Sequence, residues 1–483
     1  MNIPRLVIAG TGSGVGKTTV MVALTGALRK MGMKVATFKC GPDYLDPGWH
    51  QQASSQECHN LDGWMMGREA VTQTFQQVTE GADIALIEGV MGLFDGASPT
   101  SDAGSTAQIA LWLDAPVILV LDAGGMARSV AAMAFGFDQW HPELRLAGII
   151  ANRVGSQRHL QLLKEACSLS VFGGLPKQKD KQFPERYLGL QSVRDGGVDQ
   201  GTLDFWSDAA ADWFEIEALV DCARSAKALA HPSLSEAHSE SKKDGLAQCR
   251  IGIAYDEAFH FYYDYNLKLL KAAGAELIYF SPIKDTVLPE VDGLYIGGGY
   301  PELYGQQIAA NNSILESIRR FAYEGGPIYG ECGGLMFLTD GIAQDDHFYP
   351  MLGLIKGVAK VQKKLQALGY VEVETIANGP IGHAGLRFRG HQFRYSILDM
   401  PDEADHGFQI HRRRDRKSFA EGFRGQDSLG QLLPNVLGSW VHAHWASNDL
   451  PAKGFVESCI RFRQKSTSNT RMASDPDSIG IGT

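Results

Sequence analysis

Two segments, one near each end of the chain, carry residue types that could do chemistry. Residues 10–19 read GTGSGVGKTT, a glycine-rich loop followed by a lysine and two threonines. Residues 328–338 read IYGECGGLMFL, in which Cys332 lies among glycines after an apolar run. The first pattern is typical of nucleoside triphosphate binding, and the second indicates a nucleophilic thiol. Together they favour an enzyme that consumes ATP and takes ammonia from glutamine through an acyl-enzyme.

The glycine-rich loop follows an apolar run and opens a helix-like segment, which is the context that a phosphate-binding loop needs. Its backbone N–H groups would point at phosphate oxygens, Lys17 would bring a charge to the β- and γ-phosphates, and Thr18 would offer a hydroxyl to Mg²⁺. A tight turn without a ligand is the weaker alternative. Asn152 ends a later apolar run and is either an adenine contact or a turn residue. The predicted nucleotide-binding residues are Gly12, Gly14, Gly16, Lys17, Thr18, Thr19 and Asn152.

Acidic residues follow two predicted strands in the first half, in the segments FKCGPDYLDPGWH and IEGVMGLFDG. Open α/β sheets bind ligands beyond the C-terminal ends of their strands, and Mg²⁺ prefers oxygen ligands. The segments offer Asp43, Asp46, Glu88 and Asp95 for this purpose. Asp-Pro and Asp-Gly pairs also form plain turns, which is the alternative for Asp46 and Asp95.

Cys332 lies where an apolar run gives way to a glycine-flanked turn and a helix-like segment. A helix N-terminus would stabilise a thiolate there, and the glycines would allow close backbone approach. The thiol needs a base, and His442 and His444 are two residues apart in NVLGSWVHAHWASN, so both face one side if the segment is a strand. Only one of them need be the base. The turn formed by Gly297, Gly298 and Gly299 is the predicted oxyanion hole, with an ordinary glycine turn as the alternative.

The elements that must position these segments alternate between short apolar runs and helix-like stretches. In the first half the apolar runs are nearly continuous, as in parallel strands buried on both faces, and they lie at 5–10, 34–39, 82–89, 115–123 and 145–152. The rhythm restarts at about residue 250 after a small, polar and charged stretch. The pattern predicts an α/β protein with a doubly wound domain over 1–225, a linker over 226–248, a second α/β domain over 249–463 and a disordered tail over 464–483.

Composition excludes several classes. With 483 residues, 44% of them hydrophobic and 21% charged, the chain suits two or three globular domains, and its net charge of −10 argues against nucleic-acid binding. No apolar run approaches roughly 18 residues and no signal-peptide pattern is present, so no membrane contact is expected. Seven cysteines without a C-x-x-C pair fit a reducing cytoplasm and argue against a disulfide framework or a zinc cluster.

The assembled motifs resemble the cobyrinic acid a,c-diamide synthase family. They lie in order between residues 10 and 448, so the resemblance covers nearly the whole chain. The chain departs from the family pattern at Tyr187, Gln392, Arg394 and Trp440, where His, Glu, His and Tyr are common. The matching segments are GTGSGVGKTT, FKCGPDYLDPGWH, IEGVMGLFDG, STAQIALWLDAPVILVLDA, PERYLGL, FYYDYNLKLLKAAGAELIYFSP, GGGYPELY, ECGGLMFL, GHQFRYS and SWVHAHWASN.

The resemblance implies a phosphate-loop domain like that of dethiobiotin synthetase, followed by a class I glutamine amidotransferase-like domain without the carboxylate of the usual triad. It implies Cys332 as the nucleophile and His442 as its base. The implied reaction is amidation of the a- and c-acetate groups of cobyrinic acid in cobalamin biosynthesis, with ATP, Mg²⁺ and glutamine. For the acidic segments it implies metal ligands at Thr18, Asp43 and Glu88, and substrate or activation roles at Asp46 and Asp95.

Two alternatives to this reaction stay open. Hydrogenobyrinate or a nickel-sirohydrochlorin could be the macrocycle, with the same chemistry. A phosphate-loop regulatory or partitioning ATPase with an inactive second domain is the weaker alternative, because Cys332 and His442 are both present. The expected partners are ATP, glutamine and a corrinoid tetrapyrrole, with no nucleic acid and no membrane, and the protein is expected in the cytoplasm, with a homodimer as one option.

Overall fold

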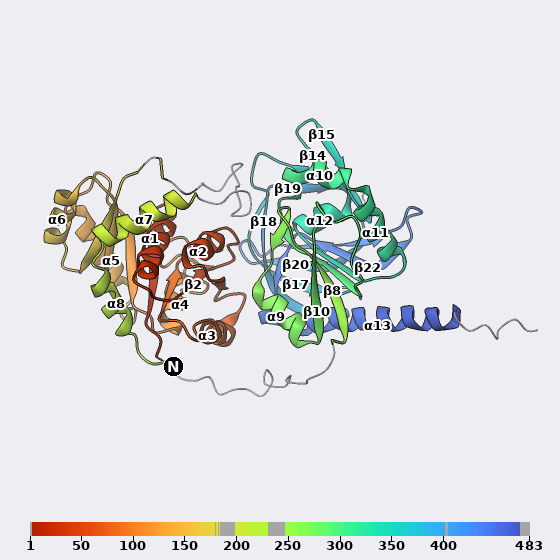
Figure 1. The fold of residues 1–483 in the computed structure, drawn as a ribbon, viewed down its shortest axis with the longest axis horizontal. Helices are drawn as coiled ribbons and strands as arrows, with labels where there is room; N and C mark the ends of the chain where they lie inside the picture. The colour runs from red at the N-terminus through yellow and green to blue at the C-terminus, as the bar shows by residue number, and fades with distance from the viewer. Residues whose placement is uncertain are drawn as a thin grey trace, which may run out of the picture. The chain divides into compact units, whose positions relative to one another are not determined.

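The computed structural model describes residues 2–178, 180, 181, 183, 199–229, 247–400 and 404–473. The chain divides into two compact units, Met1–Ser239 and Glu240–Thr483 (Figure 1). The division falls inside the predicted linker 226–248, most of which lies outside the described residues, as does Tyr187. No helix of the described residues is long and apolar enough to cross a membrane.

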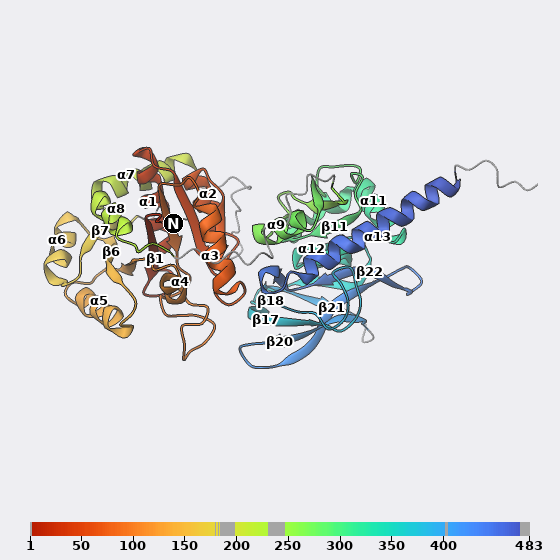
Figure 2. The ribbon, with the colours of Figure 1, turned by 90° about the horizontal axis from the view of Figure 1, so that it is seen from below.

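The N-terminal unit is built on a seven-stranded sheet in the order β3-β2-β4-β1-β5-β6-β7, with every strand pair parallel. Its strands are mostly buried apolar runs, and helices α1, α7 and α8 cover one face while α4 and α5 cover the other (Figure 2). This is the doubly wound architecture that the continuous apolar runs predict. The strands are β1 (Arg5–Gly10), β2 (Val35–Cys40), β3 (Cys58–Leu61), β4 (Ile84–Glu88), β5 (Val117–Asp122), β6 (Leu146–Val154) and β7 (Val171–Pro176). The helices are α1 (Lys17–Lys30), α2 (Asp46–Ser54), α3 (Gly67–Val78), α4 (Thr106–Trp112), α5 (Ser129–Trp140), α6 (Gln157–Ala166), α7 (Gln200–Trp213) and α8 (Ile216–Arg224).

The C-terminal unit is built on a ten-stranded mixed sheet in the order β10-β8-β11-β13-β22-β21-β20-β17-β18-β23. The four pairs from β10 to β22 in this order are parallel, and the pairs from β22 to β23 are antiparallel. Its strands are β8 (Cys249–Ala254), β9 (Phe259–Phe261), β10 (Ala275–Phe280), β11 (Gly293–Ile296), β12 (Gly298–Gly299), β13 (Ile328–Glu331), β14 (Thr339–Gln344), β15 (His347–Pro350), β16 (Ile355–Val361), β17 (Ala367–Thr375), β18 (Arg387–Arg394), β19 (Ser396–Asp399), β20 (His406–Arg412), β21 (Ser418–Gln426), β22 (Leu432–Ser439) and β23 (His442–His444). Its helices are α9 (Asp264–Ala272), α10 (Gly305–Ala310), α11 (Asn312–Tyr323), α12 (Gly333–Leu338) and α13 (Leu450–Ala473).

This second sheet has a hydrophobic core on each face. Along β11, Leu294 and Ile296 belong to one core, which includes α11 and α12. Tyr295 points to the other core, which includes part of α13. The alternation follows from the two-residue period of a strand, and the two cores explain why helices lie on both faces of this sheet.

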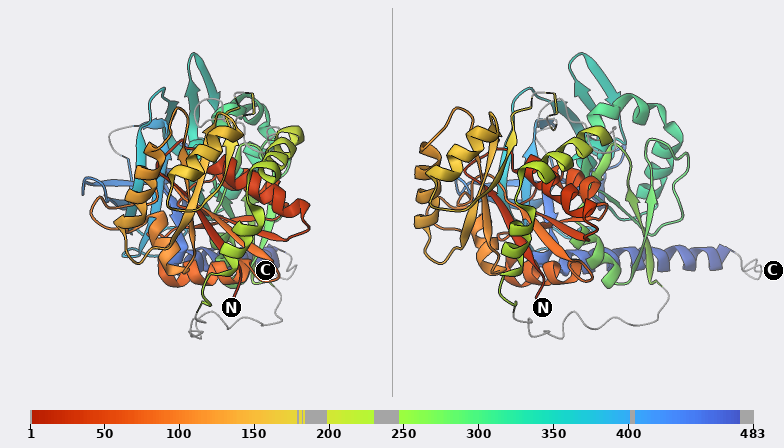
Figure 3. Two further views of the ribbon diagram at one scale, coloured as in Figure 1. Left: turned by 90° about the vertical axis from the view of Figure 1, so that its left-hand side faces the viewer. Right: turned by 60° about the vertical axis from the view of Figure 1, so that its left-hand side comes forward.

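Helix α13 corrects one prediction. The polar segment 464–483 reads as a disordered tail, yet α13 continues to Ala473 and extends as a long rod from the C-terminal unit (Figure 3). Residues 464–473 contain neither proline nor glycine, and the hydroxyls of Ser466, Thr467 and Ser468 donate to backbone carbonyls one turn earlier. These three hydroxyl groups therefore bond within the helix and do not end it. Residues 474–483 lie outside the described part.

Candidate functional site

The glycine-rich loop joins β1 to α1 and wraps around the ammonium group of Lys17. Lys17 Nζ donates to Gly12 O at 2.9 Å and to Met91 O at 2.7 Å. Gly14 and Gly16 have φ values of 74° and 96°, which a residue with a Cβ rarely adopts. Gly16 is the N-cap of α1, and Thr18 and Thr19 lie in the first turn of that helix. The loop thus has the backbone shape that would turn its N–H groups toward phosphate oxygens.

Asn152 and Arg153, near the end of β6, form hydrogen bonds to the backbone of this loop. Asn152 Nδ2 donates to Val15 O at 2.8 Å, and a Cβ on Gly16 would lie only 1.9 Å from that nitrogen. Arg153 donates to Gly14 O at 2.9 Å and forms an ion pair with Asp122. The structure therefore shows Asn152 holding the shape of the loop, and its contact with adenine stays a prediction. Arg153 is a loop contact that the sequence analysis missed.

Glu88, the last residue of β4, lies beside Thr18. The hydroxyl of Thr18 donates to Glu88 Oε1 at 2.8 Å. Adjacent oxygen ligands of an octahedral Mg²⁺ lie about 3 Å apart, since each Mg–O distance is about 2.1 Å. This oxygen pair therefore fits two neighbouring positions around Mg²⁺, and phosphate and water oxygens would fill the others. No group of three or more His, Cys, Asp or Glu side chains in the described residues is placed to hold a metal by itself.

Behind Glu88 lies a buried group of charges that the sequence analysis did not identify. Lys39 Nζ lies 2.8 Å from Glu88 Oε1 and 2.5 Å from Asp46 Oδ2, and His50 Nε2 lies 2.5 Å from Glu88 Oε2. Burial favours the neutral acid, but Lys39 and His50 outweigh it, so the pKa of Glu88 is well below its usual range. Burial also opposes the charge of Lys39, yet Asp46 and Glu88 raise the pKa of Lys39. A lysine inside the apolar strand VATFKC was the available signal.

Asp43 and Asp95 lie in turns at the same edge of the sheet. Asp43 Oδ1 accepts a hydrogen bond from the backbone N–H of Leu45 at 2.8 Å, so Asp43 shapes the turn that brings Asp46 to Lys39. Asp95 Oδ2 accepts from Gly92 N at 2.9 Å and closes the turn after Met91. Asp95 thus lies in the turn that the sequence offered as its alternative, while the metal contact of Asp43 and the substrate contact of Asp95 stay predictions.

In the C-terminal unit, Cys332 occupies a strained turn between β13 and α12. Its φ and ψ are 49° and −99°, and its N–H donates to Ser439 O at 2.7 Å. The neighbouring glycines are required by close packing, because a Cβ on Gly334 would lie 2.0 Å from Ile296 O. Burial, with the nearby Glu302, raises the pKa of Cys332 to about 12. The strained strand-to-helix turn is the geometry in which α/β enzymes display a nucleophile.

His442 lies close to this turn on β23. It pairs in register with His391 of β18, and a Cβ on Gly298 would lie 2.4 Å from His442 Cε1. Cys332 Sγ lies 4.0 Å from Phe393 O, two residues further along β18. Burial lowers the pKa of His442 to about 4, so its ring is neutral at pH 7. The fold thus gathers the thiol, an imidazole and the glycine turn at one place.

His444 has different surroundings. Its ring lies 4.7 Å from that of Tyr263 and 5.5 Å from that of Tyr265, measured between centroids, and its Nδ1 accepts a weak hydrogen bond from Ala446 N. Burial lowers the pKa of His444 to about 3. These contacts favour a structural role for His444 and leave His442 as the candidate base.

The glycine turn predicted as an oxyanion hole needs one correction. The N–H of Gly297 donates to the hydroxyl of Tyr262 at 2.7 Å, so this donor is already engaged. Gly298 and Gly299 form β12, which pairs with β9, and a Cβ on Gly333 would lie 3.0 Å from Gly299 N. The backbone of Gly299 therefore lies against the residue that follows the cysteine, and Gly298 and Gly299 stay the candidates.

Two of the positions that depart from the family pattern lie together near the thiol. The guanidinium of Arg394 stacks over the ring of Trp440 at 4.8 Å from its centroid. The charge of Arg394 favours the thiolate of Cys332, although burial outweighs it and the pKa of the thiol stays raised. The simultaneous change at both positions was a signal for this contact, because a cation–π pair needs both partners.

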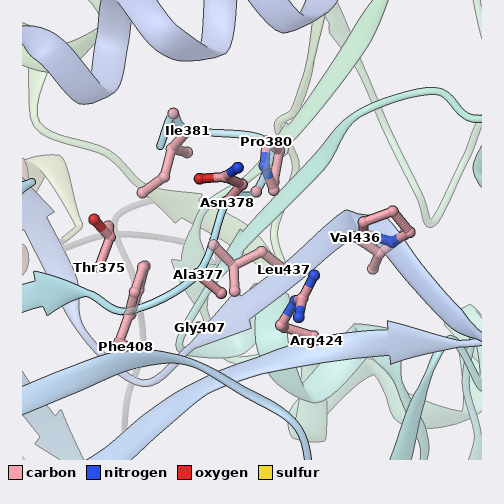
Figure 4. Close-up of a pocket in the computed structure, with 13 residues that line it drawn as sticks. Thr375, Ala377, Asn378, Pro380, Ile381, Gly407, Phe408, Arg424, Val436 and Leu437 are labelled. Atoms are coloured by element: carbon pink, nitrogen blue, oxygen red, sulfur yellow. The ribbon is translucent and has the colours of Figure 1, made fainter. Parts of the chain in front are cut away.

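A separate pocket lies elsewhere in the C-terminal unit. Its lining includes Thr375, Asn378, Phe408, Arg424 and Leu437 (Figure 4). No predicted site residue lines this pocket, and the guanidinium of Arg424 is paired with Asp405 at 3.1 Å. The reactive groups therefore lie at the Cys332 turn and not in this pocket.

Comparison with known proteins is consistent with both sites. Residues 6–186 match the family described as the CobQ/CobB/MinD/ParA nucleotide binding domain, and residues 250–450 match the CobB/CobQ-like glutamine amidotransferase domain. The cobyrinate a,c-diamide synthase of Leptospira interrogans is 50% identical over 463 residues, which cover 95% of this chain and 99% of that protein. The enzymes of the same name from Syntrophotalea carbinolica and Priestia megaterium are 44% and 39% identical, each over 95% of this chain, and the match covers 99% and 98% of those proteins.

Proposed function

This chain belongs to the cobyrinate a,c-diamide synthase family, and we propose that it amidates the a- and c-acetate carboxylates of cobyrinic acid with ammonia from glutamine, at the expense of ATP. The observation that carries the proposal is the presence of two candidate sites in one chain. One is a phosphate loop with an acidic partner, and the other is a strained cysteine with a neighbouring histidine. A carboxylate is a poor electrophile, so its amidation needs both the activation and the ammonia that these sites would provide.

The C-terminal unit would make the ammonia. The thiolate of Cys332 attacks the carboxamide carbon of glutamine, with His442 taking the thiol proton and giving it to the leaving ammonia. The N–H groups of Gly298 and Gly299 face the developing oxyanion. Water then hydrolyses the thioester to glutamate and frees the thiol.

The N-terminal unit would use the ammonia. A carboxylate oxygen of the substrate attacks the γ-phosphate of ATP, which gives an acyl phosphate and ADP, and ammonia then displaces phosphate to form the amide. Lys17 would hold the β- and γ-phosphates in line. Thr18 and Glu88 would hold Mg²⁺, which when bound neutralises phosphate charge. Asp46, at the start of α2, and Asp95, in the turn after Met91, would orient the substrate.

The division of labour is tested by replacing the nucleophile. We expect Cys332→Ser to abolish glutamine hydrolysis and glutamine-dependent amidation while amidation with ammonium salts continues, because the second site needs only ammonia. The products are measured as mass increments on cobyrinic acid, with Cys222→Ser as the matched cysteine control. Equal loss of both activities in Cys332→Ser would show that the assignment is wrong.

The phosphate loop is tested by Lys17→Ala. We expect this variant to lose amidation with either nitrogen source while glutamate release continues, because the thiol site is untouched. Full amidation by Lys17→Ala would exclude the proposed role of the loop. A regulatory ATPase with an inactive second domain would release no glutamate from the wild type.

The choice of macrocycle is tested with a panel. Cobyrinic acid, hydrogenobyrinic acid and a nickel-sirohydrochlorin are each incubated with ATP, Mg²⁺ and glutamine, and two mass increments on cobyrinic acid alone are the expected result.

A homodimer and a cytoplasmic location belong to the same proposal. Analytical ultracentrifugation and cell fractionation test them, and the seven free cysteines agree with a reducing compartment.

A further inference from the structure

The segment that carries His442 connects β22 to β23 and is held at both of its ends by buried carboxyl groups. At the first end, Glu421 Oε2 accepts from Ser439 Oγ at 2.8 Å, and Glu421 Oε1 accepts from Trp440 N at 2.6 Å. At the other end, Glu331 Oε1 accepts from Ala443 N at 3.3 Å. Glu421 belongs to β21 and Glu331 to β13, so two different strands fix one short segment.

The same segment is hydrogen-bonded to the backbone of the proposed nucleophile, Cys332. The N–H of Cys332 donates to Ser439 O at 2.7 Å, and Glu331 is the residue that precedes Cys332 in the chain. The residue whose carboxyl group accepts from Ala443 N, Glu331, is therefore also the residue that leads into the strained turn at Cys332. Displacing either carboxyl group would change where His442 stands relative to the thiol.

Resting on the glutaminase activity proposed above, we propose that Glu331 and Glu421 are positioning residues that hold the His442 segment against Cys332. Three of their hydrogen bonds go to this segment, two to backbone N–H groups and one to a serine hydroxyl. They therefore act on the backbone that carries the candidate base.

The burial of both groups supports a specific role. Their side chains are almost completely buried, and an unpaired buried carboxylate is costly where an apolar side chain would not be. Burial raises the pKa of Glu331 to about 8 and that of Glu421 to about 7. Tyr329 and Tyr295 adjoin Glu331, so a protonated carboxyl group there can accept one hydrogen bond and donate another.

The experiment compares two kinds of replacement in the full chain. Glu331→Leu and Glu421→Leu remove the acceptors, whereas Glu331→Gln and Glu421→Gln keep an amide oxygen in the same place. We expect the leucine variants to lose about 100-fold in kcat for glutamine hydrolysis, because a shift of about 1 Å in a catalytic group costs that much. Their KM for glutamine and their ammonium-dependent amidation should be unchanged, and the glutamine variants should keep most of kcat.

Asn435→Leu is the matched control. Asn435 lies on β22, like Ser439, and its side chain also bridges to backbone, donating to Ala322 O and Gly326 O at 2.8 Å. This variant should lose stability without a selective loss of kcat. If the leucine variants are insoluble, the glutamine variants decide, since a 100-fold loss in them would overturn the proposal.

The outcomes separate this inference from the function on which it rests. A wild-type enzyme that hydrolyses no glutamine refutes the proposed function. A wild-type enzyme that hydrolyses glutamine, with folded leucine variants that keep their kcat, refutes the positioning role alone. Loss of glutamine hydrolysis and ammonium-dependent amidation together in the leucine variants also refutes it, because the damage is then general.

Discussion

Both reactive groups of the thiol site are neutral in this structure. Burial raises the pKa of Cys332 to about 12 and lowers that of His442 to about 4, so neither a thiolate nor an imidazolium is favoured at neutral pH. Each shift disfavours the charged form, as desolvation must. Activation of the thiol therefore has to accompany glutamine binding, when charges form together and stabilise each other.

The pH dependence of alkylation tests this charge state. A thiolate is the species that iodoacetamide attacks, so without glutamine the alkylation rate of Cys332 should still rise between about pH 8.5 and about pH 10, where an ordinary thiol levels off. The rate is followed by peptide mass spectrometry, with Cys332→Ser to identify the signal and glutathione as the reference. A plateau below pH 8 would mean that the thiol is already ionised at rest.

The buried ion pairs of Lys39 lead to a second prediction about single residues. Removal of this lysine in Lys39→Met leaves Asp46 without its cation and Glu88 with His50 alone, which should lower the free energy of unfolding by about 3–5 kcal/mol and abolish amidation. Urea denaturation measures the change. Lys30→Met is the control, because its exposed pair with Asp208 should contribute no more than about 1 kcal/mol. Equal effects of the two variants would contradict the importance of the buried group.

Among the elements, β12 and β23 pack closely because Gly298 of β12 has no side chain where the His442 ring of β23 lies. A Cβ on Gly298 would lie 2.4 Å from His442 Cε1, which is closer than atoms can approach. The two-residue strand β12 therefore lets β23 place the imidazole beside the glycine turn. Glycine at this position is required by packing and not by a positive φ, since Gly298 is not among the positive-φ residues.

The variant Gly298→Ala tests this contact. The added methyl group must displace the His442 ring, so kcat for glutamine hydrolysis should fall about 100-fold while ammonium-dependent amidation stays normal. Gly136→Ala in α5 is the control, because no atom lies within 4 Å of its Cβ position and alanine should stabilise a helix by about 0.5–1 kcal/mol. Normal glutaminase in Gly298→Ala would show that the ring does not need this position.

On the scale of the whole molecule, the chain consists of two units with separate sheets and separate hydrophobic cores. The predicted nucleotide-binding residues lie in the first unit, and the candidate thiol site lies in the second. Each unit therefore carries the candidate site for one half of the proposed reaction, and nucleotide binding should stabilise only one of them.

Calorimetry can measure that separation. A non-hydrolysable ATP analogue with Mg²⁺, at about 100 times its Kd, should stabilise the N-terminal unit by about 2.7 kcal/mol and raise its transition temperature. The transition of the C-terminal unit should not move, and Lys17→Ala should remove the shift. If both transitions rise together in the wild type, the units unfold as one and the prediction fails.

Much of this could be predicted from residue order because the signals are local. Near-continuous apolar runs predict buried parallel strands, and the N-terminal sheet has them. Glycines flanking Lys17 and Cys332 predict tight turns before helices, and both turns are present. The prediction of a disordered tail from residue 464 also failed for a local reason. Polar composition was taken as a sign of disorder, but hydroxyl groups in this segment bond within α13.

By itself, the sequence determined the α/β class, the phosphate loop and the turn at Cys332, because each depends on neighbouring residues along the chain. Only the tertiary structure decided which groups meet across long stretches of it: Lys39 with Glu88, Asn152 with the loop, Tyr262 with the N–H of Gly297, and Glu331 with the His442 segment. Such partners are set by strand order, register and packing, and a buried polar group takes whichever partner the fold brings within hydrogen-bond distance.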